Sequence, residues 1–143
     1  MEDLRYPIGK HDVHAVLSPK DLELARRSIA ELPDRLEAAL AGLDRAKLDT
    51  RYRVGGWTVR QVVHHLADSH LNAHTRLRLG LTEDNPIVKT YDEALWAELA
   101  DAKTLDVEPS VLLLRGLHHR WSRLLETLKP GDFERQIVHP EAG

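Results

Sequence analysis

Residues 55–77, "GGWTVRQVVHHLADSHLNAHTRL", carry the strongest indication of the fold. Thr58 suits the N-cap of a helix, and the apolar residues that follow it recur with the period of an α-helix. At about 100° per residue, these apolar side chains fall within about 40° of Leu66; they are Val59, Val62, Ala73 and Leu77. The stretch therefore predicts one long amphipathic helix that ends near Leu81. It also places four of the chain's nine histidines within eleven positions.

A second amphipathic helix is predicted upstream of this stretch. Ser18 suits its N-cap and Pro19 suits its first position, and an apolar stripe then continues until the helix ends near Gly42. Pro33 lies inside this pattern and lacks the N–H that would bond to the Ile29 carbonyl. We expect a kink at Pro33 rather than a break.

The rest of the chain adds two more predicted helices. The pattern favours a short helix over residues 91–102 and a long one over about 110–128, whereas residues 1–17 are expected to form an extended arm. Residues 133–139 alternate in polarity, which suits a strand, a loop or a lead-in to a further element. Three long amphipathic helices predict a single all-α domain over residues 1–143 with the topology of an up-down bundle. Three such helices leave one flank uncovered, so we expect an incomplete bundle.

Composition excludes several classes of protein. A net charge of −3 argues against a nucleic-acid partner. The chain has no run of 18 apolar residues, so no membrane-spanning helix is expected. The absence of cysteine excludes disulfides, thiolate metal sites and a cysteine nucleophile, and a cytoplasmic location is the default expectation. Any tightly bound transition metal must therefore be held by histidine, aspartate or glutamate.

The four histidines of the central helix differ in the direction that the helix gives them. Measured from Leu66, His64 lies about 160° away and is expected to face water, and His65 lies about 100° away on one flank. His70 lies about 40° away and points inward, and His74 lies about 80° away on the other flank. The i, i+4 pair of His70 and His74 has a spacing that can share one metal ion. The alternative is a packed His70 that bonds to a carbonyl beside a surface His74.

Other polar residues have open alternatives as well. Asp68 follows His64 and His65 at helical spacing, so its carboxylate either orients one of those rings or is a solvated charge. On the last long helix, His118 falls on the apolar face, where it either lines a cavity or is a hydrogen-bonded core residue. His119 is expected to be more exposed, and the three tryptophans are expected to pack in the bundle.

Five segments of the chain occur in the order typical of one family. They are "YPIG" (6–9), "LDTRYRVGGWTVRQVVHHLADSHLNAHTRLRLGLTEDNP" (48–86), "YDEALWAEL" (91–99), "LHHRW" (117–121) and "HPE" (139–141). Together they closely resemble the YfiT-like proteins of the DinB superfamily. The resemblance implies a four-helix bundle, often dimeric, and a metal-dependent hydrolase or a thiol S-transferase. The nearest relatives look like bacillithiol transferases, so the resemblance implies bacillithiol as a possible co-substrate.

The resemblance also implies a metal site. In the family, one zinc or nickel ion is held by three histidines, and one of them is the second histidine of the "HH" pair, which is His65 here. The other two come from an H-x-x-x-H pair on a further C-terminal helix, which this chain is expected to lack. The resemblance thus favours His65 over the His70–His74 pair as a ligand. His70, His118 and Asp68 become the candidate catalytic or supporting residues.

Two functions follow as expectations. In the first, the intact protein is an enzyme that acts on a small-molecule substrate, while this 143-residue form is metal-poor and inactive. In the second, the chain is a non-catalytic, metal-free helical module that self-associates, because an uncovered apolar flank is usually covered by a partner. A homodimer, with no nucleic acid and no membrane, is the expected assembly in both.

Overall fold

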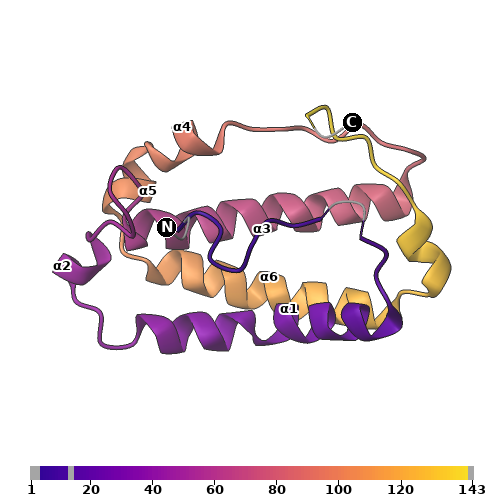
Figure 1. Cartoon of the computed structure of the whole chain (residues 1–143), viewed down its shortest axis with the longest axis horizontal. Helices are drawn as coiled ribbons and strands as arrows, with labels where there is room; N and C mark the ends of the chain where they lie inside the picture. The colour runs from indigo at the N-terminus through magenta and orange to yellow at the C-terminus, as the bar shows by residue number, and fades with distance from the viewer. Residues whose placement is uncertain (1–3, 13–14, 142–143) are drawn as a thin grey trace.

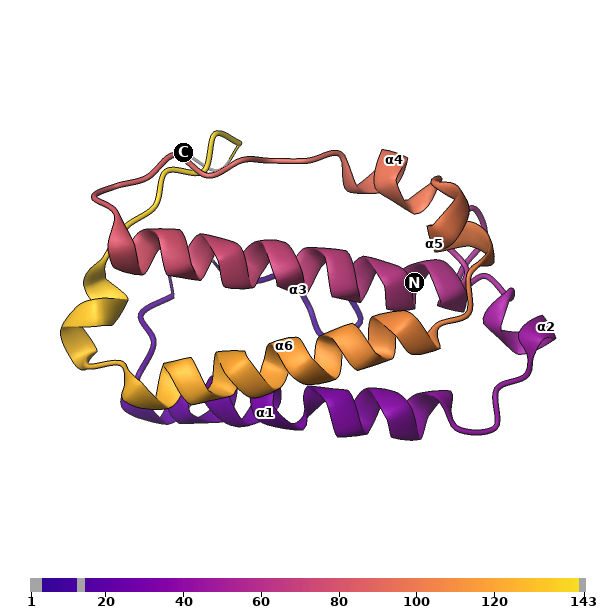
Figure 2. The same ribbon diagram turned by 180° about the vertical axis from the view of Figure 1, so that it is seen from behind.

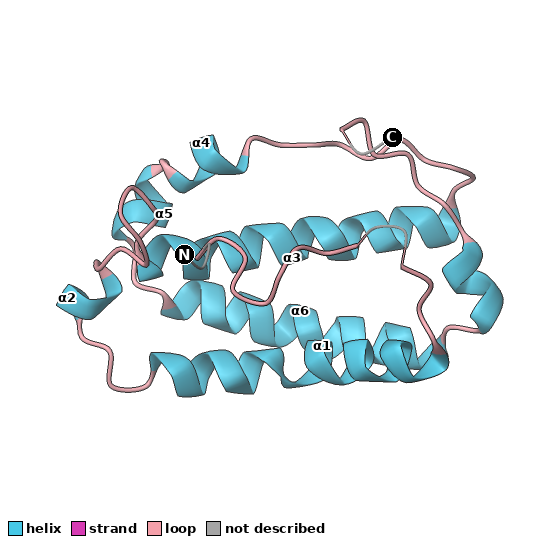
Figure 3. Cartoon of the chain, in the orientation of Figure 1, coloured by secondary structure: helices cyan, strands magenta, loops and turns pink. Residues whose placement is uncertain are grey.

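The computed structural model describes residues 4–12 and 15–141, and three long helices dominate them (Figures 1 and 3). The long helices are α1 (Pro19–Leu40), α3 (Val59–Thr82) and α6 (Glu108–Thr127). The short ones are α2 (Arg45–Leu48), α4 (Glu93–Ala97), α5 (Ala100–Thr104) and the 3-10 helix η1 (Pro130–Glu134). The described part of the chain has isolated β-bridges but no strand. The prediction of an all-α domain is confirmed.

Helix α6 is the centre of the packing. It lies against both α1 and α3, and Figure 2 shows it running between them. Its side chains Leu114 and His118 are 0% and 1% exposed, and Val63 of α3 is 2% exposed. Because α6 fills one side of the space between α1 and α3, those two helices face each other across an open groove on the other side.

The predicted starts of α1 and α3 are confirmed, and hydrogen bonds explain them. The Thr58 hydroxyl accepts a bond from the Gln61 backbone N–H at 3.1 Å, and the Gln61 side chain accepts one from the Thr58 N–H at 2.9 Å. Ser18 and Asp21 form the same reciprocal capping box at the start of α1. Helix α1 continues through Pro33 without a break, as expected.

The predicted helix over residues 91–102 is wrong as a single element. The structure has α4 and α5 instead, and Leu99 between them is extended, with ψ of 153°. The side-chain amide of Gln61 donates to the Ala97 carbonyl at 2.8 Å, so a contact with α3 satisfies the carbonyl at the end of α4. The short helix α2 was also not predicted, although Asp44 caps it through a bond from the Lys47 N–H at 2.9 Å.

The buried face of α3 is turned away from the predicted one. Leu66, the expected centre, is only partly buried, whereas Ala67, about 100° further round the helix, is 4% exposed. The reason is that α6 and α5 cover α3 from other sides, while Leu66 faces the open groove.

The two ends of the chain lie along the bundle. Residues 4–12 and 15–17 form the expected irregular arm, which crosses in front of α3 in Figure 1. The expectation also covered residues 1–3 and 13–14, which lie outside the described residues. Near the C-terminus, Val138 pairs with Pro86 and Val88 through bonds of 2.9 and 3.0 Å, so residues 133–139 are partly 3-10 helix and partly extended. Among the described helices, none is both long and apolar enough to cross a membrane.

Candidate functional site

His65 lies at the edge of the groove between α1 and α3. Its ring is partly buried and lies 4.8 Å, centroid to centroid, from the ring of Trp57, which lines the groove. No hydrogen bond engages either ring nitrogen among the described residues, and neither nitrogen is fully enclosed. Both nitrogens are therefore free to meet a metal ion or another ligand.

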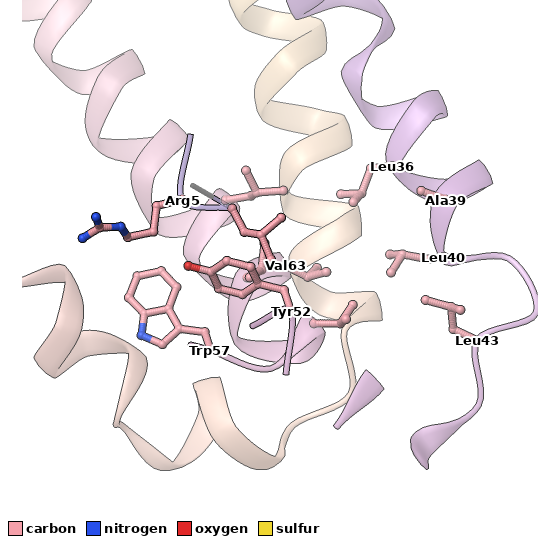
Figure 4. A pocket seen from close by; sticks show the side chains of 12 residues that line it. Arg5, Leu36, Ala39, Leu40, Leu43, Tyr52, Trp57 and Val63 are labelled. Carbon is pink, nitrogen blue, oxygen red and sulfur yellow. The ribbon is translucent and has the colours of Figure 1, made fainter. Parts of the chain in front are cut away.

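The groove itself is apolar and has a volume of about 470 Å³ (Figure 4). Its lining residues are Leu4, Arg5, Leu36, Ala39, Leu40, Leu43, Tyr52, Trp57, Val59, Val62, Val63 and Leu66. Figure 4 shows Leu36, Leu40 and Leu43 on one wall, with Tyr52 and Trp57 on the other. The groove is thus an apolar surface that the described helices leave uncovered, and Trp57, one of its lining residues, contacts His65.

His64 does not face water, so that prediction is wrong. It is 6% exposed, and its Nδ1 and Nε2 lie 2.7 Å from the Ser110 hydroxyl and 3.1 Å from the Leu105 carbonyl. The connection between α5 and α6 covers this side of α3, which the helical period of α3 alone does not reveal. His64 therefore joins α3 to the start of α6.

His70 points inward, as predicted, but its partner is another histidine. Its Nδ1 lies 2.7 Å from Nε2 of His118, and the Nδ1 of His118 lies 2.6 Å from the Ile29 carbonyl oxygen of α1. Burial, with smaller contributions from His118 and His65, lowers the pKa of His70 to about 4. His118 is the hydrogen-bonded core residue of the two alternatives, and His119 is exposed as predicted.

His74 is buried, so the expectation of a surface His74 beside a packed His70 is wrong. It is 5% exposed, its Nε2 has no hydrogen-bond partner, and its ring meets Trp121 at a centroid distance of 6.1 Å. Burial, followed by the charges of Arg78 and Arg120, lowers its pKa. No group of three potential metal ligands converges anywhere in the described part of the chain, so His70 and His74 find no third ligand there.

Asp68 orients neither of its neighbouring histidines in this structure. None of the hydrogen bonds of the described residues joins its carboxylate to His64 or His65, and His64 is held by Ser110 and Leu105 instead. Partial burial, followed by the charge of Asp101, raises the pKa of Asp68, while His65 and His64 act in the opposite direction. Its carboxylate is thus a partly buried group that orients neither ring, rather than either of the two alternatives.

The tryptophans divide between the groove and the histidine cluster. Trp57 contacts His65, and Trp121 lies 5.5–6.1 Å from the rings of His70, His74 and His118. Trp96, in contrast, is 38% exposed and its ring contacts the ring of Tyr91 at a tilt of 42°, so it does not pack in the bundle as expected. The spacing of "LHHRW" offered one signal for the cluster, since it places His118 and Trp121 three residues apart on one helix face.

The fold and this arrangement of histidines define a class of protein. The family model described as "DinB superfamily" matches residues 28–143. A solved structure, "YfiT from Bacillus subtilis is a probable metal-dependent hydrolase with an unusual four-helix bundle topology", superposes with a TM-score of 0.92 at 46% identity, covering 96% of this chain and 79% of that one.

Curated relatives agree with this assignment. A protein of Bacillus mycoides strain KBAB4 is 48% identical over 143 residues, which are 100% of this chain and 82% of the relative. One of Geobacillus thermodenitrificans strain NG80-2 is 50% identical over 141 residues, which are 99% of this chain and 79% of the relative. Both carry the name "Putative metal-dependent hydrolase". The chain belongs to the DinB superfamily and is a YfiT-like member of it.

Proposed function

We propose that this chain is a metal-dependent hydrolase of the YfiT type, in which His65 is one of the metal ligands. The observation that carries the proposal is the His65 ring, which has both nitrogens free beside an open groove. The names of the relatives and of the solved structure support the coarse activity. A divalent metal binds an imidazole through one deprotonated ring nitrogen that has no other partner, and the His65 ring offers such a nitrogen.

The described residues do not supply a complete metal centre by themselves. Three ligands do not converge among them, so His65 is the one member of the proposed set that they contain. In our proposal, an H-x-x-x-H pair on a fourth long helix supplies the other two, and this helix lies in the groove between α1 and α3. Three facts support this: the groove is apolar and borders on His65, YfiT is described as a four-helix bundle, and about a fifth of each relative lies outside the match.

Zinc or nickel is the proposed metal, because imidazole ligands suit both ions. Such an ion lowers the pKa of a water or thiol nucleophile. With water the reaction is hydrolysis, and with bacillithiol it is thiol S-transfer. The chain has no cysteine, so the sulfur of the second reaction would come from the co-substrate.

Metal analysis tests the proposal. We would measure the zinc and nickel content of the 143-residue chain and of a chimera that continues it with the C-terminal segment of the Bacillus mycoides relative. We expect well under one equivalent per chain in the first after dialysis, and about one in the second. His65→Ala should remove the metal from the chimera, whereas His119→Ala, at an exposed position, should leave it in place. Metal retained by the His65→Ala chimera would exclude His65 as a ligand.

The open groove also supports the alternative of a non-catalytic module that self-associates. A second copy of the chain would then cover the apolar lining, which gives a homodimer. Sedimentation equilibrium distinguishes a dimer of the family's kind from a dimer that forms only because the groove is uncovered. A dimer of the 143-residue chain that persists in the metal-loaded chimera supports the family's dimeric assembly, whereas a dimer of the short chain that disappears in the chimera shows that a helix and a second copy compete for the groove.

A further inference from the structure

A series of hydrogen bonds runs from α1 through α6 to α3. Its first member is the Ile29 carbonyl, which an ordinary helix would pair with the N–H of residue 33. Residue 33 is a buried proline with no N–H, so this carbonyl is left without its helical partner. The Nδ1 of His118 lies 2.6 Å from it, and the Nε2 of His118 lies 2.7 Å from Nδ1 of His70.

The direction of each bond follows from the first one. A carbonyl oxygen only accepts, so Nδ1 of His118 must carry a hydrogen. His118 is 1% exposed and no carboxylate contacts it among the described residues, so a charged ring would be buried without a counter-charge, which is costly. The neutral ring has a lone pair on Nε2, and His70 must therefore donate to it from Nδ1. This leaves the Nε2 of His70 without a hydrogen.

The Nε2 of His70 is accessible. It has no hydrogen-bond partner among the described residues, and it is not one of their enclosed, unpartnered nitrogens, unlike the Nε2 of His74. The low pKa of His70, about 4, agrees with a ring that stays neutral over the physiological range. The causes of the lowered pKa are, in order, burial of the ring, the neighbouring His118 and the more distant His65.

We propose that the Ile29 carbonyl and His118 lock His70 in its Nδ1–H tautomer, so that its Nε2 is a standing acceptor for an O–H or S–H donor. His118 is the positioning residue, and Pro33 is the reason that the carbonyl is available. The identity of the donor rests on the proposed function: it is the water or thiol nucleophile, or a hydroxyl of the substrate. His70 accepts a hydrogen bond from this group and orients it, and the proton stays on the donor.

Nitrogen NMR of the imidazole rings tests the lock directly at neutral pH in the 143-residue chain. We expect His70 of the wild type to be almost wholly in the Nδ1–H form. His118→Asn keeps a donor near the Ile29 carbonyl but removes the acceptor for His70, and should convert most of His70 to the Nε2–H form. His118→Gln places an amide oxygen near the former Nε2 and should restore the Nδ1–H form. His119→Asn, at the exposed neighbouring position, should change nothing.

The readout separates this inference from the proposed function. A wild-type His70 in the Nε2–H form, or one that does not respond to His118→Asn in a folded chain, would overturn the lock. If the lock is observed and the metal-loaded chimera is inactive towards every ester and thiol-acceptor substrate tried, the proposed function fails while the tautomer assignment stands. If the chimera is active, we expect His118→Asn to lower kcat at least tenfold and His118→Gln to recover most of it.

Discussion

At the scale of single residues, neighbouring histidines on one helix have different surroundings. His64 is bonded at both nitrogens, His65 is bonded at neither, and His70 is bonded at one. A metal ligand needs at least one ring nitrogen without another partner, whereas a ring with two fixed bonds suits a structural role. The hydrogen-bond partners of each ring, rather than the number of histidines, therefore determine what each histidine of α3 can do.

The lowered pKa of His70 predicts that acid destabilises the fold. The unfolded chain binds a proton on this ring below about pH 6.5, but the folded chain binds it only near pH 4. This ring therefore does not make the free energy of unfolding depend on pH above about pH 6.5. As the pH falls from about 6.5 to 4, protonation of the ring in the unfolded chain lowers the free energy of unfolding. Because part of the ring is open to solvent, we expect a loss of about 1 to 2 kcal/mol rather than the full value of the shift.

Urea unfolding between pH 4 and 7.5 measures this effect. His70→Asn should reduce the pH dependence of the free energy of unfolding in that window, while His119→Asn should leave it unchanged. Carboxylates titrate in both variants and cancel in the comparison. Equal pH dependence in the wild type and His70→Asn would contradict the prediction.

At the scale of elements, the caps and the proline determine where α1 and α3 begin and how they meet their neighbours. Helix α3 starts at a reciprocal box between Thr58 and Gln61, and Gln61 also holds the end of α4. Arg135 donates to the Gly80 and Glu83 carbonyls at 2.6 and 2.8 Å, which ties the C-terminal segment to the end of α3. Both ends of α3 are thus joined to segments that are distant in sequence.

Removing the N-cap of α3 should lower stability. Thr58→Ala leaves the Gln61 N–H without its acceptor, and we expect a loss of about 1 kcal/mol in the free energy of unfolding. Thr75→Ala is the matched control, because Thr75 is exposed in the middle of the same helix and its hydroxyl bonds only to the Leu71 carbonyl. The control should change stability by less than about 0.5 kcal/mol. Similar losses in the two variants would argue against the cap.

At the scale of the whole molecule, the apolar surface of the bundle exceeds what its described helices cover. Helix α6 separates α1 from α3, and Leu66 faces the resulting groove instead of a core. The groove therefore stays apolar and open beside His65, and the proposed metal centre would be completed there.

An apolar dye should detect this groove. We expect the 143-residue chain to increase the fluorescence of anilinonaphthalene sulfonate at neutral pH, and Leu66→Lys to reduce the increase at least threefold. Leu112→Lys is the control, because Leu112 of α6 is 60% exposed and does not line the groove. Near-ultraviolet circular dichroism should show native packing in both. Equal dye binding by the two variants would place the apolar site elsewhere.

Much of this protein is determined by the sequence itself. The capping residues and the helical period predicted α1, α3 and α6, and the segment around "HH" indicated the superfamily. The accommodation of Pro33 within α1 was predictable too, because the loss of one N–H is a local event. Where residues 98–99 interrupt the predicted helix, the Ala97 carbonyl accepts a bond from a distant side chain, Gln61, and a local pattern does not contain such a contact.

Which histidines are buried, and what they bind, depends instead on how the helices pack. The helical period gives the angle of His64 or His74 about the axis of α3, but burial depends on which neighbour covers that angle. The connection before α6 buries His64, and α6 buries His74 beside Trp121. The bond between His70 and His118 joins residues 48 apart, and that between His118 and Ile29 joins residues 89 apart. Contacts over such separations exist only once the helices have packed.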